Sequence, residues 1–196
     1  TLCCTSRRPI TRLALARPPG TGKSYLAGSI VAALAARGER TAVTTQSHAA
    51  YQIVLEEAER QGLGEHQIRI GGGKHPRFTV ASGDKLAAFL RDHHGAVAGG
   101  TKWTFSSDEV AGEFDTLIVD EAGQFALVDL VAISRCARKI VLLGDPQQLP
   151  MVLTAEHPEP ADRSAMEHWL HGAGGSPTVP PDYGILLTAT RRMHPL

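Results

Sequence analysis

The sequence has few cysteines, few aromatic residues, no long apolar run and no excess of either charge. Its 196 residues include three cysteines and 5% aromatic residues, and 20 Lys and Arg balance 20 Asp and Glu. Two cysteines are adjacent near the N-terminus and Cys136 is distant, which excludes a disulfide framework and indicates a reducing, cytoplasmic setting. No stretch approaches the ~20 apolar residues that span a bilayer. Zero net charge excludes binding to nucleic acid by bulk charge, but it does not exclude binding through a local basic groove.

The sequence does contain an alternation of short apolar runs and helical periods. Apolar runs predict strands at residues 13–16, 40–45, 68–70, 96–98, 116–119, 139–143 and 185–187. Periodic segments predict helices at 24–36, 48–61 (with Ser47 as N-cap), 84–93 and 125–135. This alternation predicts one doubly wound α/β domain with a mostly parallel sheet. Because ligands of such sheets lie beyond the carboxyl ends of the strands, we expect the chemistry just after residues 16, 45, 119, 143 and 187.

A glycine-rich segment between the first strand and the first helix has the form of a phosphate-binding loop. Its glycines free the backbone to turn N–H groups onto a polyphosphate at a helix N-terminus. Lys23 would reach the β- and γ-phosphates, and the Ser24 hydroxyl would bind Mg²⁺. The nucleotide-binding residues are thus Pro19, Gly20, Thr21, Gly22, Lys23, Ser24 and Tyr25. Arg17 stands where the pattern has its first glycine, and the alternative interpretation is a Gly/Pro turn capped by Ser24.

Two carboxylates follow the apolar run at 116–119. Beside a phosphate loop, we expect Asp120 to hold Mg²⁺, directly or through water, and Glu121 to polarise the water that attacks the γ-phosphate. The alternative is an acidic pair that enters a helix and is favoured by the helix dipole. The phosphate loop upstream favours the catalytic interpretation.

Polar residues also follow the next two strands. The segment 144–150 contains two glutamines, of which Gln148 is the candidate to sense a γ-phosphate, although a simple turn is the alternative. Residues 191–195 contain Arg192, which in the role of an arginine finger would stabilise charge on the γ-phosphate. A solvated basic segment is the alternative there.

These segments in this order resemble motifs I to IV of superfamily 1 helicases of the Upf-like branch. The residues concerned are 18–24, 120–124, 144–150 and 192–195. More narrowly, residues 43–48, 99–103, 157–159 and 164–168 resemble the helicase portion of bacterial proteins that join a RecB-type nuclease to such a helicase. The resemblance runs from about residue 13 to the end.

The resemblance implies a RecA-like P-loop NTPase fold and an ATP-driven motor on single-stranded DNA, with RNA left open. It implies that Lys23, Glu121, Gln148 and Arg192 act in hydrolysis, with ATP and Mg²⁺ as cofactors. It also implies contacts to the nucleic-acid backbone by Thr44, Thr45, Ser47 and Thr101. Trp103 or Phe105 would offer a stacking face for a base. Ordinary β-propensity for the two threonines and core packing for the aromatic residues are the alternatives.

We expect residues 1–196 to form a single RecA-like domain, with 1–12 as a poorly defined lead. The family's second motor domain, and any RecB-type nuclease domain, would belong to the full-length protein. Two other functions stay open. One is a P-loop ATPase of another class, such as an AAA-type ATPase or a nucleotide kinase. The other is a non-catalytic module that binds nucleotide or nucleic acid, which Arg17 and the lack of a glutamine upstream of the phosphate loop would explain; the first glutamine is Gln46.

Overall fold

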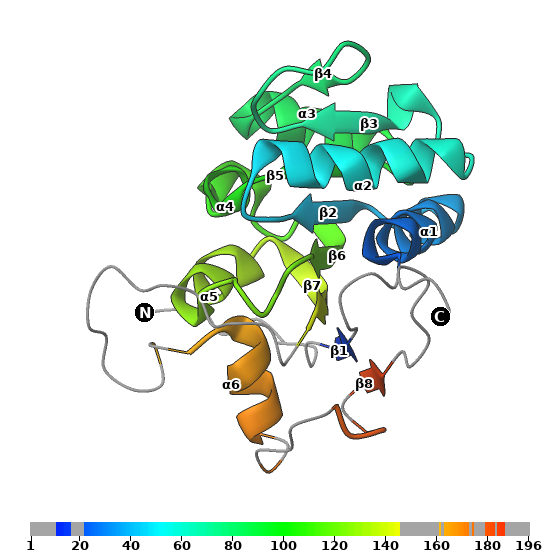
Figure 1. Cartoon of the computed structure of the whole chain (residues 1–196). Coiled ribbons are helices and arrows are strands. Elements are labelled where there is room, and N and C mark those ends of the chain that lie inside the picture. The colour runs from blue at the N-terminus through cyan, green and yellow to red at the C-terminus, as the bar shows by residue number, and fades with distance from the viewer. Residues whose placement is uncertain are drawn as a thin grey trace, which may run out of the picture.

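A computed structural model describes residues 11–16, 22–145, 161, 163–172, 174, 179–182 and 184–186. In these residues the chain forms one eight-stranded sheet in the order β4-β3-β5-β2-β6-β7-β1-β8, and every recorded strand pair is parallel. Figure 1 shows this order from β4 at the top to β8 at the bottom. The strands are β1 (Thr11–Ala16), β2 (Thr41–Thr44), β3 (Ile68–Ile70), β4 (Thr79–Val80), β5 (Val97–Gly100), β6 (Phe114–Val119), β7 (Ala137–Gly144) and β8 (Gly184–Leu186).

Helices connect the strands on both faces of the sheet. They are α1 (Lys23–Ala36), α2 (His48–Arg60), α3 (Gly83–Asp92), α4 (Lys102–Phe105), α5 (Leu127–Ser134) and α6 (Ala165–Gly172), with 3₁₀ turns η1 (Glu65–Gln67) and η2 (Asp108–Val110). In the described part of the chain, none of the helices combines the length and apolar character needed to cross a membrane. The predicted doubly wound α/β class is therefore confirmed.

Two apolar clusters form the core, one on each face of the sheet. Helices α1 and α2 pack on one face, where Val31 and Leu55 meet the inward residues Val43 and Ile118. Helices α3, α5 and α6 pack on the other face against alternate residues of the same strands, such as Leu117. The period of two along a strand explains this division, because neighbouring side chains point to opposite faces.

The connections that follow the strands with the predicted motifs lead to opposite faces of the sheet. The connection after β1 leads into α1 on one face, whereas the connection after β6 leads into α5 on the other. Strand β7 lies between β6 and β1. Connections that leave toward opposite faces open a crevice at the carboxyl ends of the strands, where doubly wound sheets bind their ligands. The fold therefore brings the ends of β1, β6 and β7 to one edge.

The predicted elements agree with the structure, with a few differences. Ser47 is the N-cap of α2, and its side chain accepts a hydrogen bond from the Ala50 N–H. The short elements β4, α4 and α6 were not predicted. Strand β5 also runs on through Gly99 and Gly100, a pair that reads as a turn. A Cβ on Gly99 would lie 2.7 Å from the Tyr51 ring, so the missing side chain lets α2 pack directly on the sheet.

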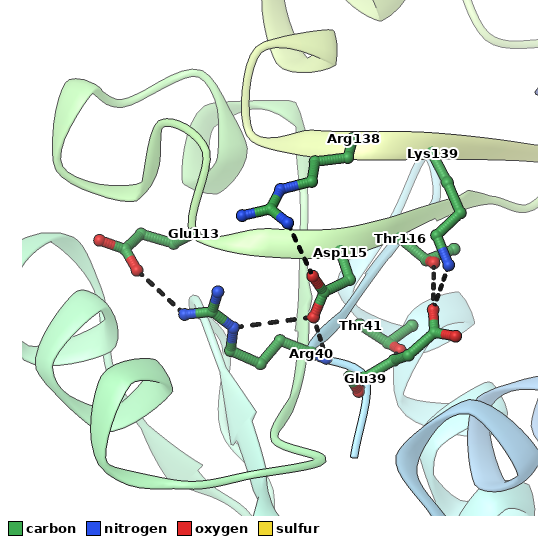
Figure 2. Close-up of polar contacts among 8 residues, drawn as sticks. All are labelled: Glu39, Arg40, Thr41, Glu113, Asp115, Thr116, Arg138 and Lys139. Atoms are coloured by element: carbon green, nitrogen blue, oxygen red, sulfur yellow. Dashed lines mark hydrogen bonds and ion pairs between the residues drawn. The ribbon is translucent and has the colours of Figure 1, made fainter. Parts of the chain in front are cut away.

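The amino edge of the sheet carries a network of paired charges centred on Glu39. This residue precedes β2, and its carboxylate accepts hydrogen bonds from Lys139 Nζ at 2.5 Å and Thr116 Oγ1 at 3.1 Å. Arg37 adds an ion pair at 3.2 Å. The hydrogen bond from Lys139 is the main cause that lowers the pKa of Glu39, and burial opposes it. Glu39 thereby joins three strands, β2, β6 and β7, near their amino ends (Figure 2).

Arg40 extends this network along the amino edge. Its backbone N–H donates to Asp115 Oδ2 at 2.9 Å, and its guanidinium donates to Glu113 Oε2 at 3.3 Å. Figure 2 shows Arg40 between these two acids, with Arg138 approaching Asp115 from β7. Asp115 and Arg138 form an ion pair at 3.9 Å. Each charged side chain drawn in Figure 2 therefore has at least one partner of opposite charge.

Candidate functional site

The N-terminus of α1 forms the described part of the predicted phosphate loop. Gly22 is the N-cap in the left-handed conformation, with φ of 73°, and its carbonyl accepts from the Leu26 N–H at 3.1 Å. Glycine adopts this conformation without the steric cost that a side chain would bring. Lys23 and Ser24 follow in the first turn and are half-buried, and the Tyr25 side chain is 62% exposed. Pro19, Gly20, Thr21 and Arg17 lie outside the described residues.

The two predicted acids lie directly after β6 and differ in their surroundings. Asp120 is only 6% exposed, its backbone N–H donates to the Thr44 carbonyl, and its Oδ1 accepts from the Glu121 N–H at 2.9 Å. Glu121 has φ of 56° and is the one non-glycine residue of the described chain with positive φ. This conformation costs an L-residue roughly 1–2 kcal/mol. Strain of this kind persists where the surrounding structure enforces it, which is typical of functional sites.

Two glycines bring the turn after β6 into contact with the end of β7. The Ala122 N–H donates to the Leu143 carbonyl at 2.8 Å. A Cβ on Gly123 would lie 2.8 Å from the Asp145 carbonyl oxygen, and one on Gly144 would lie 3.0 Å from the Gly123 nitrogen. These backbones are too close for any side chain. The turn that holds Glu121 is therefore fixed against the start of the 144–150 segment, an interaction that the sequence analysis missed.

The start of α6 packs on the same turn. Ala165 and Met166 donate backbone hydrogen bonds to the carbonyls of Phe125 and Ala122. A reciprocal pair caps the helix: the Glu167 N–H donates to Ser164 Oγ at 3.1 Å, and the Ser164 N–H donates to Glu167 Oε2 at 2.8 Å. This is a capping box, whose S-x-x-E spacing is readable in the sequence and could have predicted α6.

The predicted nucleic-acid residues after β2 fall into two groups. Thr44 is fully buried, and its hydroxyl has no hydrogen-bond partner among the described residues. Thr45 is also buried, and its hydroxyl donates to the Ser47 carbonyl at 2.8 Å and accepts from the Ser47 N–H at 3.3 Å. Ser47 is exposed. Thr45 thus fixes a turn that leaves Ser47 exposed.

Gln46 links this turn to the turn that holds Glu121. Its side-chain amide donates to the Gln124 carbonyl at 2.9 Å, across 78 residues of sequence. The Gln124 N–H in turn donates to the Glu121 carbonyl at 2.8 Å. A chain of two hydrogen bonds therefore connects the predicted nucleic-acid turn to the predicted catalytic acid.

The segment after β5 lies beside the segment after β2, because Gly100 is in register with Thr44. Thr101 is half-buried at the N-terminus of α4. The two aromatic alternatives now separate: Phe105 is buried against Phe114, whereas the Trp103 side chain is 77% exposed. Phe105 belongs to the core, and Trp103 is the residue available for stacking.

The described edge has the oxygen donors that Mg²⁺ requires. The Ser24 hydroxyl lies in the first turn of α1, and the Asp120 carboxylate lies at the end of β6. Hydroxyl, carboxylate and water oxygens are the ligands that this cation prefers. Asp145 is a second buried carboxylate, at the end of β7. The donor set therefore fits a magnesium-bound nucleotide. Gln148 and Arg192 lie outside the described residues.

Comparison with known proteins finds similarity to an AAA domain and to a DNA helicase/nuclease. The family model described as an AAA domain matches residues 99–156, from β5 through the segment after β7. The DNA replication ATP-dependent helicase/nuclease dna2 of Schizosaccharomyces pombe is 31% identical over 143 residues, which cover 67% of this chain. The chain spans only 10% of the length of that relative.

Solved structures with low sequence identity share the fold. The arterivirus nonstructural protein 10 helicase, in a complex with DNA, has a TM-score of 0.50 and 22% identity, over 76% of this chain and 32% of its own. The C-terminal domain of a possible DNA helicase from Lactobacillus plantarum has a TM-score of 0.50 and 13% identity, over 92% of this chain and 87% of its own. These similarities confirm the α/β fold of P-loop motor domains.

Proposed function

We propose that this chain is the first motor domain of a superfamily 1 DNA helicase, which couples Mg·ATP hydrolysis to movement along single-stranded nucleic acid. The observation that carries this proposal is the gathering of the predicted motifs at one edge of the sheet. The start of α1, the strained Glu121 and the Ser47 turn all lie at carboxyl strand ends. A hydrogen bond from Gln46 joins two of them.

The proposed ATP site uses the first turn of α1 and the turn after β6. Lys23 binds the terminal phosphates, and backbone N–H groups from Gly20 to Tyr25 cradle the polyphosphate, with Pro19 and Thr21 completing the loop. Ser24 and Asp120 would hold Mg²⁺, which neutralises charge on the phosphate oxygens. Glu121 orients and deprotonates the attacking water, Gln148 senses the γ-phosphate, and Arg192 stabilises the charge on it. Phosphoryl transfer depends mainly on such positioning and electrostatics.

The proposed nucleic-acid track runs over the exits of β2 and β5. Ser47 and Thr101 contact phosphates through side-chain and backbone groups, which suits binding without sequence preference. Because Thr44 and Thr45 are buried, their contribution is made through the main chain and the shape of the turn. We propose single-stranded DNA as the track, with RNA as the alternative that a binding competition would distinguish.

The wider arrangement follows from the same proposal. Residues 1–196 form a single RecA-like domain, and a second RecA-like domain of the full-length protein closes over the ATP. The motif resemblance supports fusion to a RecB-type nuclease domain, and the helicase/nuclease relative is consistent with it. A cytoplasmic setting is proposed from the low cysteine content.

The test is ATP turnover in the full-length protein, with and without oligothymidylate, in the unaltered protein and in Lys23→Ala. We expect turnover to require Lys23 and to rise with the oligonucleotide. The matched control is Lys85→Ala, because Lys85 is an exposed lysine at the start of α3, after β4, and β4 lies six steps from β1 along the sheet order. Turnover that is equal in all three proteins would contradict the motor.

One other outcome has its own explanation in the sequence. Arg17 replaces the first glycine of the phosphate loop, and a side chain there can crowd the turn. If the unaltered protein turns over no faster than Lys23→Ala and Arg17→Gly restores turnover, the chain is a degenerate binding module.

A further inference from the structure

We propose that Trp103 is a stacking platform for one base of the single-stranded nucleic acid. The proposal deepens the proposed function and depends on it. It assigns an aromatic contact, in addition to phosphate contacts, to the exit of β5. The evidence is that α4 is held rigidly on three sides while its remaining side chain points into solvent.

Three of the four side chains of α4 are fixed by specific contacts. Phe105 is fully buried, with its ring edge-on to that of Phe114 at 5.5 Å. Lys102 Nζ donates to Asp129 Oδ2 on α5 at 2.7 Å. Thr104 is packed against two glycines, because a Cβ would lie 2.2 Å from it at Gly71 and 2.7 Å from it at Gly100. Because these two glycines have no side chain, α4 packs directly on the ends of β3 and β5.

Trp103 is the fourth side chain and the most exposed large apolar residue of the described chain, at 77%. Tryptophan is normally highly buried, so an exposed ring on a rigid support calls for a binding partner. Lys102 Nζ lies 5.5 Å from the ring centroid. The Lys102 charge is already paired with Asp129, so the ring itself supplies the interaction with a nucleotide, by stacking on its base.

The residues next to Trp103 in the sequence favour a nucleic-acid base over a protein partner. The residues beside Trp103 in the chain are polar and half-buried: Thr101, Lys102, Thr104 and Ser106. Protein interfaces place their aromatic anchors within a larger apolar core. The helix α4 also follows Gly100, which pairs with Thr44, so α4 begins beside the strand end from which the Ser47 turn leaves. Phosphate contacts at Ser47 and Thr101 would therefore bring a neighbouring base within reach of the ring.

The experiment measures the binding of two labelled strands of about 16 nucleotides, an oligothymidylate and its abasic analogue, to the intact protein. We expect Trp103→Ala to weaken oligothymidylate binding about 5- to 150-fold, and Trp103→Phe to keep most of the affinity. We expect binding of the abasic strand to be weak in the unaltered protein and to change no further in Trp103→Ala. Only base stacking predicts this dependence on both partners.

Two controls accompany these variants. Val131→Ala removes another exposed apolar side chain, on α5, and should leave binding unchanged. The protein has two tryptophans, so Trp169→Phe leaves Trp103 as the single reporter, and its fluorescence should be quenched by oligothymidylate and not by the abasic strand. Equal melting temperatures of Trp103→Ala and the unaltered protein verify folding.

The outcomes separate this inference from the proposed function. If the unaltered protein binds neither strand, both are wrong. If it binds oligothymidylate and Trp103→Ala binds equally well, or loses the same factor on both strands, the platform alone is wrong. Unchanged DNA binding with lost self-association in Trp103→Ala would assign the ring to protein docking and would also overturn it.

Discussion

The two edges of the same sheet differ in their unpaired, strained and exposed groups. At the amino edge, Glu39 is bonded to Lys139 and Thr116, and Arg40 is bonded to Glu113 and Asp115. At the carboxyl edge, the buried Thr44 hydroxyl has no partner among the described residues, Glu121 is held at φ of 56°, and Trp103 is exposed. The two edges are the opposite ends of the same parallel strands, so the strand pairing itself does not cause the difference between their side chains.

The contrast indicates where the protein gives up stability. A buried hydroxyl without a partner costs about 1–3 kcal/mol, and a strained backbone residue costs a similar amount. Such costs persist in a marginally stable protein where the same residues serve a function. The amino edge carries none of these features among its described residues, and we assign it a stabilising role.

The largest expected effect is the loss of ATP turnover in Glu121→Gly. Removal of the carboxylate should lower turnover about 10²- to 10⁴-fold, the range for a general base. Because glycine accepts positive φ, the free energy of unfolding should stay equal or rise by up to about 1 kcal/mol. Steady-state turnover and a urea titration measure the two quantities. Glu113→Gln at the amino edge is the control and should keep full turnover; a Glu121→Gly protein that does so as well would remove Glu121 from the mechanism.

A smaller loss is expected where the turns after β6 and β7 touch. In Gly123→Ala the new methyl would lie 2.8 Å from the Asp145 carbonyl oxygen, so one backbone must move. We expect the free energy of unfolding to fall by about 1–3 kcal/mol, as in other overpacked sites. Gly172→Ala is the matched control, because nothing lies within 4 Å of a Cβ there, and it should be neutral or slightly stabilising. Equal effects in the two variants would show that the turns are not in tight contact.

At the amino edge, Glu39→Gln should destabilise the protein without changing the turnover of the folded enzyme. The replaced carboxylate leaves Lys139 without its hydrogen-bonded charge, at a cost of about 1–3 kcal/mol. The folded state lowers the pKa of Glu39, chiefly through Lys139. The stabilisation is therefore complete above the ordinary glutamate pKa of about 4.3 and is lost as the pH falls from there through the lowered value.

Urea titrations at several pH values test this dependence. The difference in unfolding free energy between the unaltered protein and Glu39→Gln should be constant near neutral pH and shrink below about pH 4.3. A difference that grows on acidification would contradict the sign of the pKa change.

The sequence was sufficient for the order of the main elements and for the edge at which polar motifs gather. Unbroken apolar runs identified β6 and β7, and the glycine-rich turn before a helical period located the start of α1. These signals are local, so one sequence carries them. The helix α4 was not predicted, because its four residues are stabilised by contacts with Gly71 and Asp129, which are distant in the chain.

Distant packing also decided which candidate side chains reach solvent. Thr44 and Ser47 had equal standing as phosphate contacts, yet one is buried and the other exposed. Trp103 and Phe105 are two residues apart and differ in the same way. Short segments at strand ends have no period that tells inward from outward positions, so only the packed neighbours settle it.

Substitution of one buried threonine at each edge compares the two edges directly. The expected changes in the free energy of unfolding are near 1 kcal/mol and opposite in sign. Thr116 is buried at the amino edge and donates to Glu39 at 3.1 Å, so Thr116→Val should lower the free energy of unfolding by about 1 kcal/mol. Thr44→Val removes a buried hydroxyl without a described partner and should raise it by about the same amount. Chemical denaturation measures the free energy of unfolding of both variants. Changes of the same sign would contradict the difference between the two edges.

The smallest effect concerns communication within the carboxyl edge. Gln46 is exposed, and its hydrogen bond to the Gln124 carbonyl is worth about 0.5 kcal/mol at the low end of the usual range. Gln46→Ala should therefore reduce by about twofold the effect of a non-hydrolysable ATP analogue on oligothymidylate affinity. Linkage requires the oligonucleotide to lose the same factor in its effect on the affinity for the analogue. Gln52→Ala removes an equivalent hydrogen bond, from the Gln52 side-chain amide to the Lys74 carbonyl at 3.2 Å. This hydrogen bond does not lead to the turn that holds Glu121. An equal loss of this coupling in both variants would place the effect in α2. Coupling through the Gln124 turn requires a loss that is confined to Gln46→Ala and is the same for the effect of the analogue on oligothymidylate binding and for the reverse effect.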